Sequence, residues 1–121
     1  KQANRLLQSE TATTEGRTVV SNYYEALNKK DYHGAYRYLS ARAMERYGTF
    51  ELWEQAMTKE EVPKVKAIQL DYVSQDQDDD IVVNYMGFTI TFEDNLEPVL
   101  VRLHNEGKGW GIVAIEAAEE D

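Results

Sequence analysis

Hydrophobic residues change their spacing along this chain at Pro63. Before Pro63 they recur at the intervals of a helix, and after it they alternate with polar residues as in a strand. Helices followed by consecutive strands are the order expected of an α+β domain whose helices cover one face of an antiparallel sheet. The pattern therefore predicts three N-terminal helices packed on a curved, four-stranded antiparallel meander.

The first predicted helix has a broad hydrophobic stripe and an N-cap at Thr13 or Thr14. The stripe consists of Val19, Val20, Tyr23, Tyr24 and Leu27. The residues before this helix lack sustained periodicity and are rich in Ser, Thr and Glu. We therefore expect residues 1–14 to form a tether or a frayed tail, and the folded domain to begin near Glu15.

Two shorter helices are predicted to follow. Asp31 is placed to cap the second helix, which Ser40 closes. After a helical turn through residues 41–47, Thr49 caps the third helix. Pro63 ends this helix, because a proline ring cannot be accommodated inside one.

The second half of the chain predicts four strands joined by three hairpins. The residues expected to face inward alternate along the first, third and last strands: Ile68, Leu70 and Tyr72; Val99, Val101 and Leu103; Trp110, Ile112 and Ala114. Residues 81–92 are predicted to form one long strand with a bulge at Gly87. Polar or glycine-rich turns are expected at residues 76–80, 94–98 and 105–109.

Length and composition fit one folded domain. At 121 residues and 42% hydrophobic content, the chain is long enough to bury a single core. We assign residues 15–117 to this domain and residues 118–121 to an acidic tail. The absence of cysteine excludes disulfides, thiolate zinc sites and cysteine nucleophiles. Because the chain opens at Lys1 rather than at Met, we expect a trimmed leader. The expected location is extracytoplasmic, at a bacterial cell surface or secreted, with a lipoprotein-like tether outside this chain.

Negative charge is concentrated in the strand half. Residues 1–62 hold nine Lys or Arg and nine Asp or Glu, whereas residues 63–121 hold four and thirteen, so the whole net charge of −9 lies in the second half. An acidic domain repels nucleic-acid phosphates and anionic lipids, so neither is an expected partner. Most of these charges fall in predicted turns, where they favour solubility and discourage edge-to-edge pairing of sheets.

Three segments resemble one known superfamily: Val19–Ser40, Thr49–Glu51 and Gly109–Ile112. They are similar to the nuclear transport factor 2-like superfamily, which has a cystatin-like α+β fold, and most of all to its small exported bacterial branch. The similarity spans about residues 15–117, and its strongest part is a helix, a Lys-Asp-Tyr turn and a second helix ending in Leu-Ser. It implies helices and a curved sheet that form a cone around a cavity. Members range from isomerases and dehydratases to transport adaptors and secretion assembly factors, so the resemblance implies no single function.

Isomerase-like chemistry in such a cavity needs an inward carboxylate or imidazole beside a tyrosine donor. Alternation turns Asp71 outward if Leu70 faces the core. His104 shares the outer face with Arg102, and His33 lies at the rim of its helical stripe. With no inward acid or base, the sequence predicts a domain that is not an enzyme and has no catalytic residues and no cofactor.

The aromatic residues allow two interpretations. Eight Tyr, three Phe and two Trp suit a packed core, because large rings fill the space between helices and sheet. They also suit a ligand cavity with apolar walls and hydroxyl donors. The walls of such a ligand-binding pocket are expected at Tyr36, Trp53, Tyr72 and Tyr85.

An acidic turn invites a calcium interpretation. Asp76, Asp78 and Asp80 match the first three ligand positions of an EF-hand loop. The sixth and twelfth positions hold Ile81 and Gly87 in place of the required Gly and Glu. The sequence therefore predicts a charged hairpin tip and no metal site.

These observations favour a non-enzymatic accessory or interaction domain that binds an unidentified protein partner. One alternative is an enzyme or carrier for a small apolar ligand held between helices and sheet. A second is an assembly subunit of a secretion or conjugation apparatus, in which the exposed sheet face or an edge supports self-association, for example as a homodimer. A filled interior would favour the first function, an inward carboxylate or histidine an enzyme, and a broad apolar surface the assembly subunit.

Overall fold

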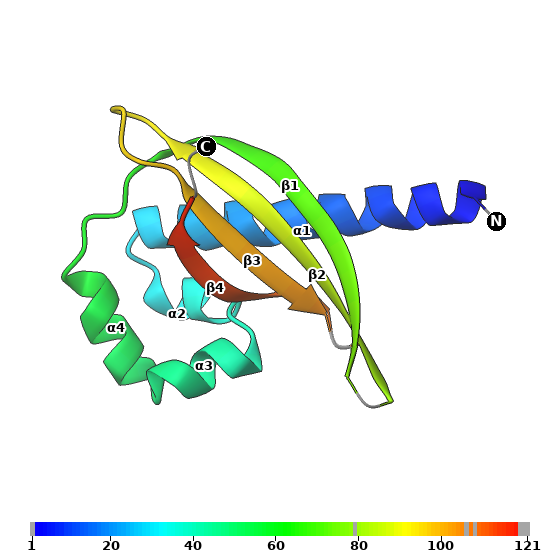
Figure 1. The fold of residues 1–121 in the computed structure, drawn as a ribbon. Helices are drawn as coiled ribbons and strands as arrows, with labels where there is room; N and C mark the ends of the chain where they lie inside the picture. Colours follow the sequence, from blue (N-terminus) through cyan, green and yellow to red (C-terminus); the bar gives the residue numbers. More distant parts are fainter. Residues whose placement is uncertain (1, 79, 106, 108, 119–121) are drawn as a thin grey trace.

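In the computed structural model, the residues described are 2–78, 80–105, 107 and 109–118, with side chains described for 10–77, 80, 82–105, 107 and 109–118. Four helices precede four strands (Figure 1): α1 Gln2–Asn28, α2 Tyr32–Tyr36, α3 Ala41–Tyr47, α4 Phe50–Thr58, β1 Val65–Asp78, β2 Ile81–Phe92, β3 Val99–Asn105 and β4 Gly111–Ala117. The strands form one open antiparallel sheet in the order β1-β2-β3-β4. The predicted α+β meander is therefore confirmed, with one helix more than expected because residues 41–47 form a complete helix.

The first helix is longer than predicted. α1 begins at Gln2, and the N-cap expected at Thr13 or Thr14 is wrong. Thr14 instead lies inside the helix, where its hydroxyl donates to the Glu10 carbonyl at 3.0 Å. Such a bond to the preceding turn lets Ser and Thr occupy helix interiors, so the polar composition of residues 10–14 does not break the helix.

The short helices begin at the predicted caps. The side chains of Asp31 and Thr49 each accept a hydrogen bond from a backbone N–H in the first turn of α2 and α4. Ser40 caps the start of α3, through Ala43, and does not close α2 as predicted. α4 ends at Thr58, well before the proline that was expected to stop it.

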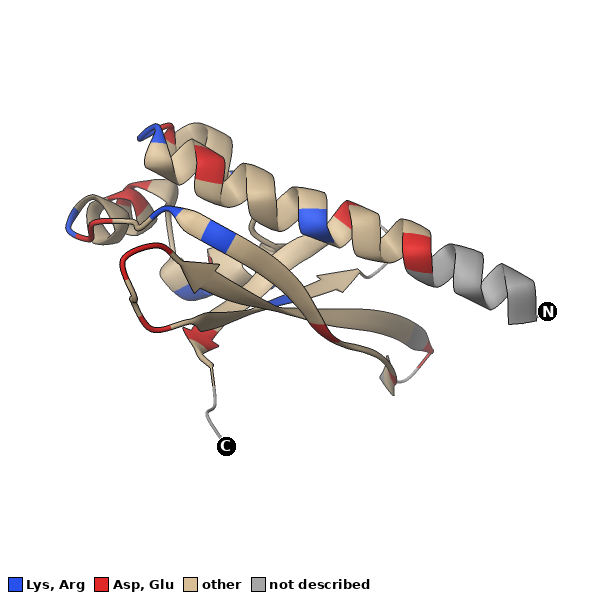
Figure 2. Cartoon of the chain, turned by 90° about the horizontal axis from the view of Figure 1, so that it is seen from above, with Lys and Arg blue, Asp and Glu red and all other residues tan. Residues whose placement is uncertain are grey.

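One face of the sheet carries the core. Figures 1 and 2 show α1 lying across this face, with its N-terminal end extending beyond the strands. The helix approaches closely at Gly16, where a Cβ would lie 2.6 Å from the Met86 sulfur and 3.0 Å from the Phe88 ring. The fully buried large residues are Trp53, Tyr23, Phe88, Met86, Ile90, Leu103, Ile112, Val20 and Val101. Helix-facing residues of β2 and β3 therefore form one core with α1 and α4.

A bulge in β1 changes the predicted alternation. Leu70 pairs with Phe88 and Tyr72 with Gly87, so Asp71 is an extra residue on β1. Directly paired residues share a face of the sheet, and successive residues of β2 point to opposite faces. Tyr72 therefore lies on the face away from the helices, and its predicted place beside Leu70 is wrong. The bulge stands opposite Gly87 as expected, but the extra residue belongs to β1.

Acidic side chains gather at the hairpin turns. Figure 2 shows Asp and Glu at the β1–β2 tip and along the β2–β3 turn, whereas the helices carry residues of both charges. The predicted acidic tail at residues 118–121 lies, except for Ala118, outside the described residues.

Candidate functional site

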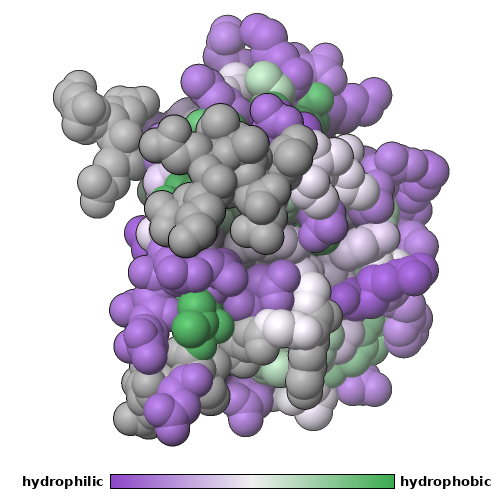
Figure 3. Space-filling view, turned by 90° about the vertical axis from the view of Figure 1, so that its right-hand side faces the viewer, coloured by the Kyte–Doolittle hydropathy of each residue, from purple (hydrophilic) through white to green (hydrophobic). Residues whose placement is uncertain are grey.

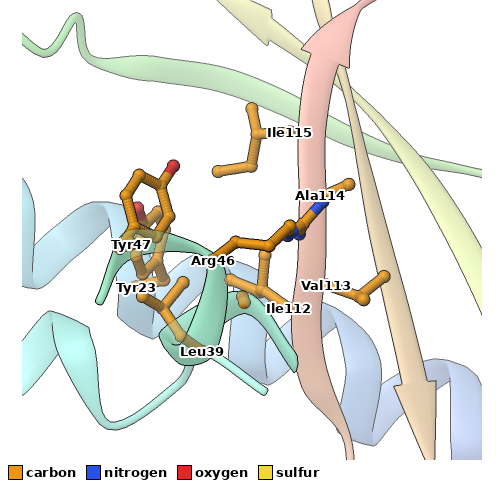
Figure 4. A pocket seen from close by; sticks show the side chains of 9 residues that line it. Tyr23, Leu39, Arg46, Tyr47, Ile112, Val113, Ala114 and Ile115 are labelled. Carbon is orange, nitrogen blue, oxygen red and sulfur yellow. The ribbon is translucent and has the colours of Figure 1, made fainter. Parts of the chain in front are cut away.

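A pocket of about 230 Å³ lies between α3 and the edge strand β4, on the helix-covered side of the sheet (Figure 4). We refer to it as the α3–β4 pocket. It is lined by Tyr23, Leu39, Ala43, Arg46, Tyr47, Ile112, Val113, Ala114 and Ile115. Figure 4 shows two tyrosines on the helical side, the isoleucines on the β4 side, and Arg46 between them.

The connection between α2 and α3 fastens this pocket to the sheet. The Ser40 N–H donates to the Ile112 carbonyl, and the Ile112 N–H donates to the Tyr38 carbonyl, both at 2.8 Å. These bonds make a short parallel bridge between Leu39 and Ile112. Gly111 permits the approach, because a Cβ there would lie 2.9 Å from the Ser40 Cα. The floor of the pocket is thus held by backbone contacts.

A second bulge shapes the β4 wall. Consecutive residues of β3 pair with Ile112 and Ala114, so Val113 is an extra residue in β4. The bulge shifts the alternation by one position. Ile115 therefore shares the helix-facing side with Ile112, and the predicted inward position of Ala114 is wrong.

The pocket combines a buried phenol with one cation. Tyr23 is almost fully buried, and this burial, helped by the neighbouring Tyr24, raises the pKa of its phenol well above the usual range. The phenol therefore stays protonated. Arg46 is the one charged side chain in the described lining, which contains no carboxylate and no imidazole. The pocket offers hydrogen-bond donors beside apolar walls, and lacks a proton shuttle.

The pocket opens beside a strand edge. Tyr47 and Ile115, at its rim, are 45% and 40% exposed. On its outer side β4 is paired through Ile112 alone, and no further backbone hydrogen bond joins that edge to the described chain. Residues 113–117 therefore present backbone donors and acceptors next to exposed hydrophobic side chains.

The four expected pocket walls are split between the two faces of the sheet. Tyr36 and Trp53 lie on the helical side, 5.1 Å apart between ring centroids, in a cluster that includes Phe50. Tyr72 covers Gly87 on the opposite face, where an added Cβ would lie 2.1 Å from the Tyr72 ring. Tyr85 is on that face too, because it pairs with Ser74 two positions beyond Tyr72. The structure thus does not bring the four tyrosine and tryptophan side chains around one cavity.

Asp71 and His104, the two strand residues considered for acid–base chemistry, differ in burial. Asp71 is exposed at its bulge, as predicted. His104 pairs with Tyr85 and shares the outer face with Arg102, also as predicted, but its side chain is only 6% exposed. Its outer position does not leave it in contact with water, because residues of the α2–α3 connection and of the β3–β4 turn line a second pocket with it.

The described residues show neither a metal centre nor a membrane-spanning helix. No group of three or more His, Cys, Asp or Glu side chains in the described residues is arranged to hold a metal ion. Of the predicted EF-hand-like turn, the side chains of Asp78 and Ile81 lie outside the described residues. No helix in the described part of the chain is long and apolar enough to cross a bilayer.

Comparisons with known proteins leave the family open. No model of a protein family, no curated protein and no solved structure matches this chain. The site must therefore be interpreted from its own geometry.

Sequence reasoning missed most of the pocket lining. Arg46 and Ile115 had no distinguishing neighbours in the sequence, since their roles depend on the Val113 bulge and on the contact between α3 and β4. The one available signal was Gly111, directly before a hydrophobic strand, since a glycine at such a place permits close backbone approach.

Proposed function

We propose that this protein is a non-enzymatic interaction domain that binds an extended segment of a partner protein along β4. The observation that carries the proposal is the open outer edge of residues 113–117 beside the α3–β4 pocket. Addition of a strand to an exposed edge is a recurring mode of peptide recognition, in which backbone bonds provide affinity and neighbouring pockets provide specificity.

The chemistry of the pocket defines the preferred segment. Tyr47 and Ile115 offer an apolar rim for one hydrophobic side chain of the partner. Arg46 favours a carboxylate nearby, and a guanidinium can bind a carboxylate through two parallel hydrogen bonds. The proposed ligand is thus an extended peptide with a large hydrophobic residue close to an Asp, a Glu or a C-terminus.

The remainder of the interior supports binding over catalysis. Trp53, Phe88 and Met86 fill the space between the helices and the sheet. The α3–β4 pocket itself has a protonated phenol and a guanidinium, neither of which takes a proton from a substrate at neutral pH.

Membership of the nuclear transport factor 2-like superfamily is part of this proposal. The order of helices before an antiparallel meander, with helices over one face, supports it.

A peptide library tests the proposal. We expect the protein to select extended peptides with a hydrophobic residue next to an acid, and the selected peptides to shift the amide NMR signals of β4 and α3. Ile115→Lys should weaken binding at least tenfold, since it places a cation and its water at the rim. Val82→Lys is the matched control, because Val82 has a similar exposure of 46% on β2.

Four outcomes would contradict the proposal. Selected peptides whose signals map away from β4, or an Ile115→Lys variant that binds as well as Val82→Lys, would place the site elsewhere. A homodimer joined through β4 would make the edge an assembly interface. A small molecule retained in the α3–β4 pocket under native mass spectrometry would favour the carrier alternative.

A further inference from the structure

The outer edge of β4 is closed at one end. The Ile112 N–H and C=O groups are already bonded to the α2–α3 connection, through the Tyr38 carbonyl and the Ser40 N–H. Directly after Ser40, which is its N-cap, α3 begins. A strand added to this edge therefore cannot continue past Ile112 toward the N-terminus of β4. Beyond Ile115, it must end or turn away within the length of Val113 and Ala114.

The backbone groups that remain open are those of Ile115 and Ala117. The N–H groups of successive strand residues point to opposite sides of the strand. The Ala118 N–H donates to the carbonyl of Pro98, directly before β3, at 3.3 Å, so the groups of Ala117 and Ile115 point outward. Those of Ile112 also point outward, because the bulge between the two isoleucines adds one residue. Within the described residues, no backbone bond engages the outward groups of Ile115 and Ala117.

The closed end of the edge carries a positive charge. Arg46 lines the α3–β4 pocket, and Figure 4 shows its side chain between α3 and β4. No carboxylate in the described part of the chain forms an ion pair with Arg46. Glu60 helps to raise the pKa of the Tyr23 phenol, but it does not line the pocket. A chain that ends beside Arg46 is therefore favoured if its end is negative, as a carboxy terminus is, and disfavoured if it is an amino terminus.

We propose that the partner segment is a free carboxy terminus, bound antiparallel to β4 with its last residue opposite Ile115. This inference rests on the function proposed above, and it specifies the direction and the end of the ligand. A chain whose carboxy terminus points to the closed end of the edge must run antiparallel to β4. In such a pair, the N–H of the last residue donates to the Ile115 carbonyl, and one oxygen of its carboxylate accepts the Ile115 N–H. The carboxylate then lies near Ala114, where Arg46 can donate charged hydrogen bonds to it.

Alternation assigns a side to each of the last residues of the partner. The last side chain shares the helix-facing side with Ile115, where Tyr23 and Tyr47 line the pocket, so a large hydrophobic residue fits there. The side chain before it points to the outer face, beside the ion pair of Arg102 with Glu116. Water reaches this pair, because both side chains are about half exposed, so a polar residue suits this position. The expected ligand thus ends in a polar residue followed by a large hydrophobic one.

Three peptides of one parent sequence test the inference. The parent is acetyl-Thr-Val-Thr-Val-Thr-Phe with a free carboxylate; the second peptide is its C-terminal amide, and the third continues after Phe with Gly-Ser-Gly. In NMR titrations of the isotope-labelled full chain, the parent should shift the amide signals of Ile115 and Ala117. It should bind about tenfold more tightly than the amide, which lacks the charged hydrogen bonds. The extended peptide should also bind weakly, because the bridge at Ile112 obstructs its last residues.

The outcomes separate this inference from the function on which it rests. Equal binding of all three peptides at β4 would overturn the carboxy terminus as the ligand and leave strand addition at this edge intact. If none of the peptides shifts the β4 signals at millimolar concentration, both the inference and the proposed function are contradicted.

The direction of the bound strand is tested by a nitroxide at the amino end of the parent peptide. In the antiparallel arrangement this end lies beyond Ala117, so the nitroxide should broaden the signals of Ala117 and Ala118 more than that of Ser40. Stronger broadening at Ser40 would overturn the inference, because the strand would then run parallel to β4.

Paired variants test the role of Arg46. Arg46→Gln should reduce the preference for the parent over the amide from about tenfold to less than about threefold, and should leave binding of the amide unchanged. The control Arg37→Gln makes the same change at an exposed arginine that does not line the α3–β4 pocket, and it should keep the full preference. Thermal unfolding verifies that both variants are folded. An unchanged preference in Arg46→Gln, or an equal loss in both variants, would overturn the inference.

Discussion

The two edges of the sheet are protected differently. β1 spans 14 residues and contains two bulges, at Lys66 and Asp71, each of which interrupts pairing with a charged extra residue. Arg17 of α1 donates to the Ile68 carbonyl on this strand, and its guanidinium lies 5.6 Å from the centre of the Phe88 ring. Bulges, charges and a covering side chain are the usual means by which edge strands avoid pairing with other proteins.

β4, the opposite edge, has less protection. It has seven residues, and the bridge at Ile112 covers only its beginning. The rest lies beside the hydrophobic rim made by Tyr47 and Ile115. Figure 3 views the molecule from the side at which α1 projects, and there hydrophobic residues are small spots within a largely hydrophilic surface. The contrast teaches that β1 is protected against pairing with other strands and β4 is not, and that the unprotected edge is the one beside the α3–β4 pocket.

The largest expected effect concerns the tyrosines behind the two edges. Tyr23 lines the α3–β4 pocket, whereas Tyr24 packs against Phe92, 5.7 Å between ring centroids, at the β1 side of the sheet. Burial raises the pKa of both phenols above the ordinary value of 10.0. Below pH 10 both states of the chain keep these protons, so the two phenols add no pH dependence to the stability. Above pH 10 the unfolded chain loses them first, so stability falls by about 2.7 kcal/mol per pH unit.

Urea unfolding at pH 9, 10.5 and 11.5 measures this loss. Tyr23→Phe and Tyr24→Phe should each remove about half of the added slope, because each removes one titrating group. Tyr85→Phe, at a partly exposed tyrosine, is the control for the loss of a phenol outside α1. An unaltered slope in both buried variants would refute the assignment of the pH dependence to α1.

The next effect concerns the one covered part of β4. Gly111→Ala places a Cβ against the Ser40 backbone, which cannot move like the end of a flexible side chain. We expect a loss of about 2 kcal/mol in the free energy of unfolding. A melting curve followed by circular dichroism measures it. Gly107→Ala meets no atom within 4 Å and pays only for its positive φ of 104°, about 1 kcal/mol, so it serves as the comparison. Equal losses in the two variants would argue against a close β4 contact.

A smaller effect is expected at the protected edge. Arg17→Ala removes the bond to the Ile68 carbonyl and the cation over Phe88, at a cost of about 1 kcal/mol. The variant should also self-associate through the uncovered β1 edge, which sedimentation at rising concentration would detect. Thr18→Ala, one residue along and exposed, is the control. A monomeric Arg17→Ala protein would show that the bulges protect β1 without help from α1.

The smallest effect is expected for the ion pair of Arg102 with Glu116, at the outer face of β4. Both side chains are about half exposed, so the pair gains little over water. Glu116→Gln should change the unfolding free energy by less than about 0.5 kcal/mol and leave the oligomeric state unchanged. A larger loss, or dimerisation, would mean that this charge protects the β4 edge.

Local sequence patterns predicted the order of the helices and strands. Most wrong predictions of which face a strand residue occupies come from the two bulges beside Tyr72 and Ala114. Asp31 and Thr49 cap their helices as expected, because a cap depends on residues within one turn. Strict alternation failed at Tyr72 and Ala114, since the extra residues at Asp71 and Val113 are determined by pairing with distant strands.

The candidate site was harder to predict than the fold. The burial of His104 depends on the distant α2–α3 connection, which no local pattern announces. The α3–β4 pocket likewise joins Arg46 to Ile115, residues that are close only once the sheet is complete. The positions of Asp and Glu in the sequence, in contrast, predicted the acidic hairpin turns, because charged residues are rarely buried and turns lie at the surface.

The extra residue at Asp71 separates two parts of β1 whose even-numbered residues line opposite faces of the sheet. Before Asp71, Ile68 and Leu70 lie on the face of the sheet that the helices cover. After Asp71, Tyr72 lies on the opposite face. Deleting Asp71 would remove the bulge and leave Leu70 opposite Phe88 and Tyr72 opposite Gly87, so both parts of the strand would keep their present faces. The loss of this one residue therefore preserves the pairing with β2, whereas a one-residue shift of the paired strand would move its side chains to the other face of the sheet.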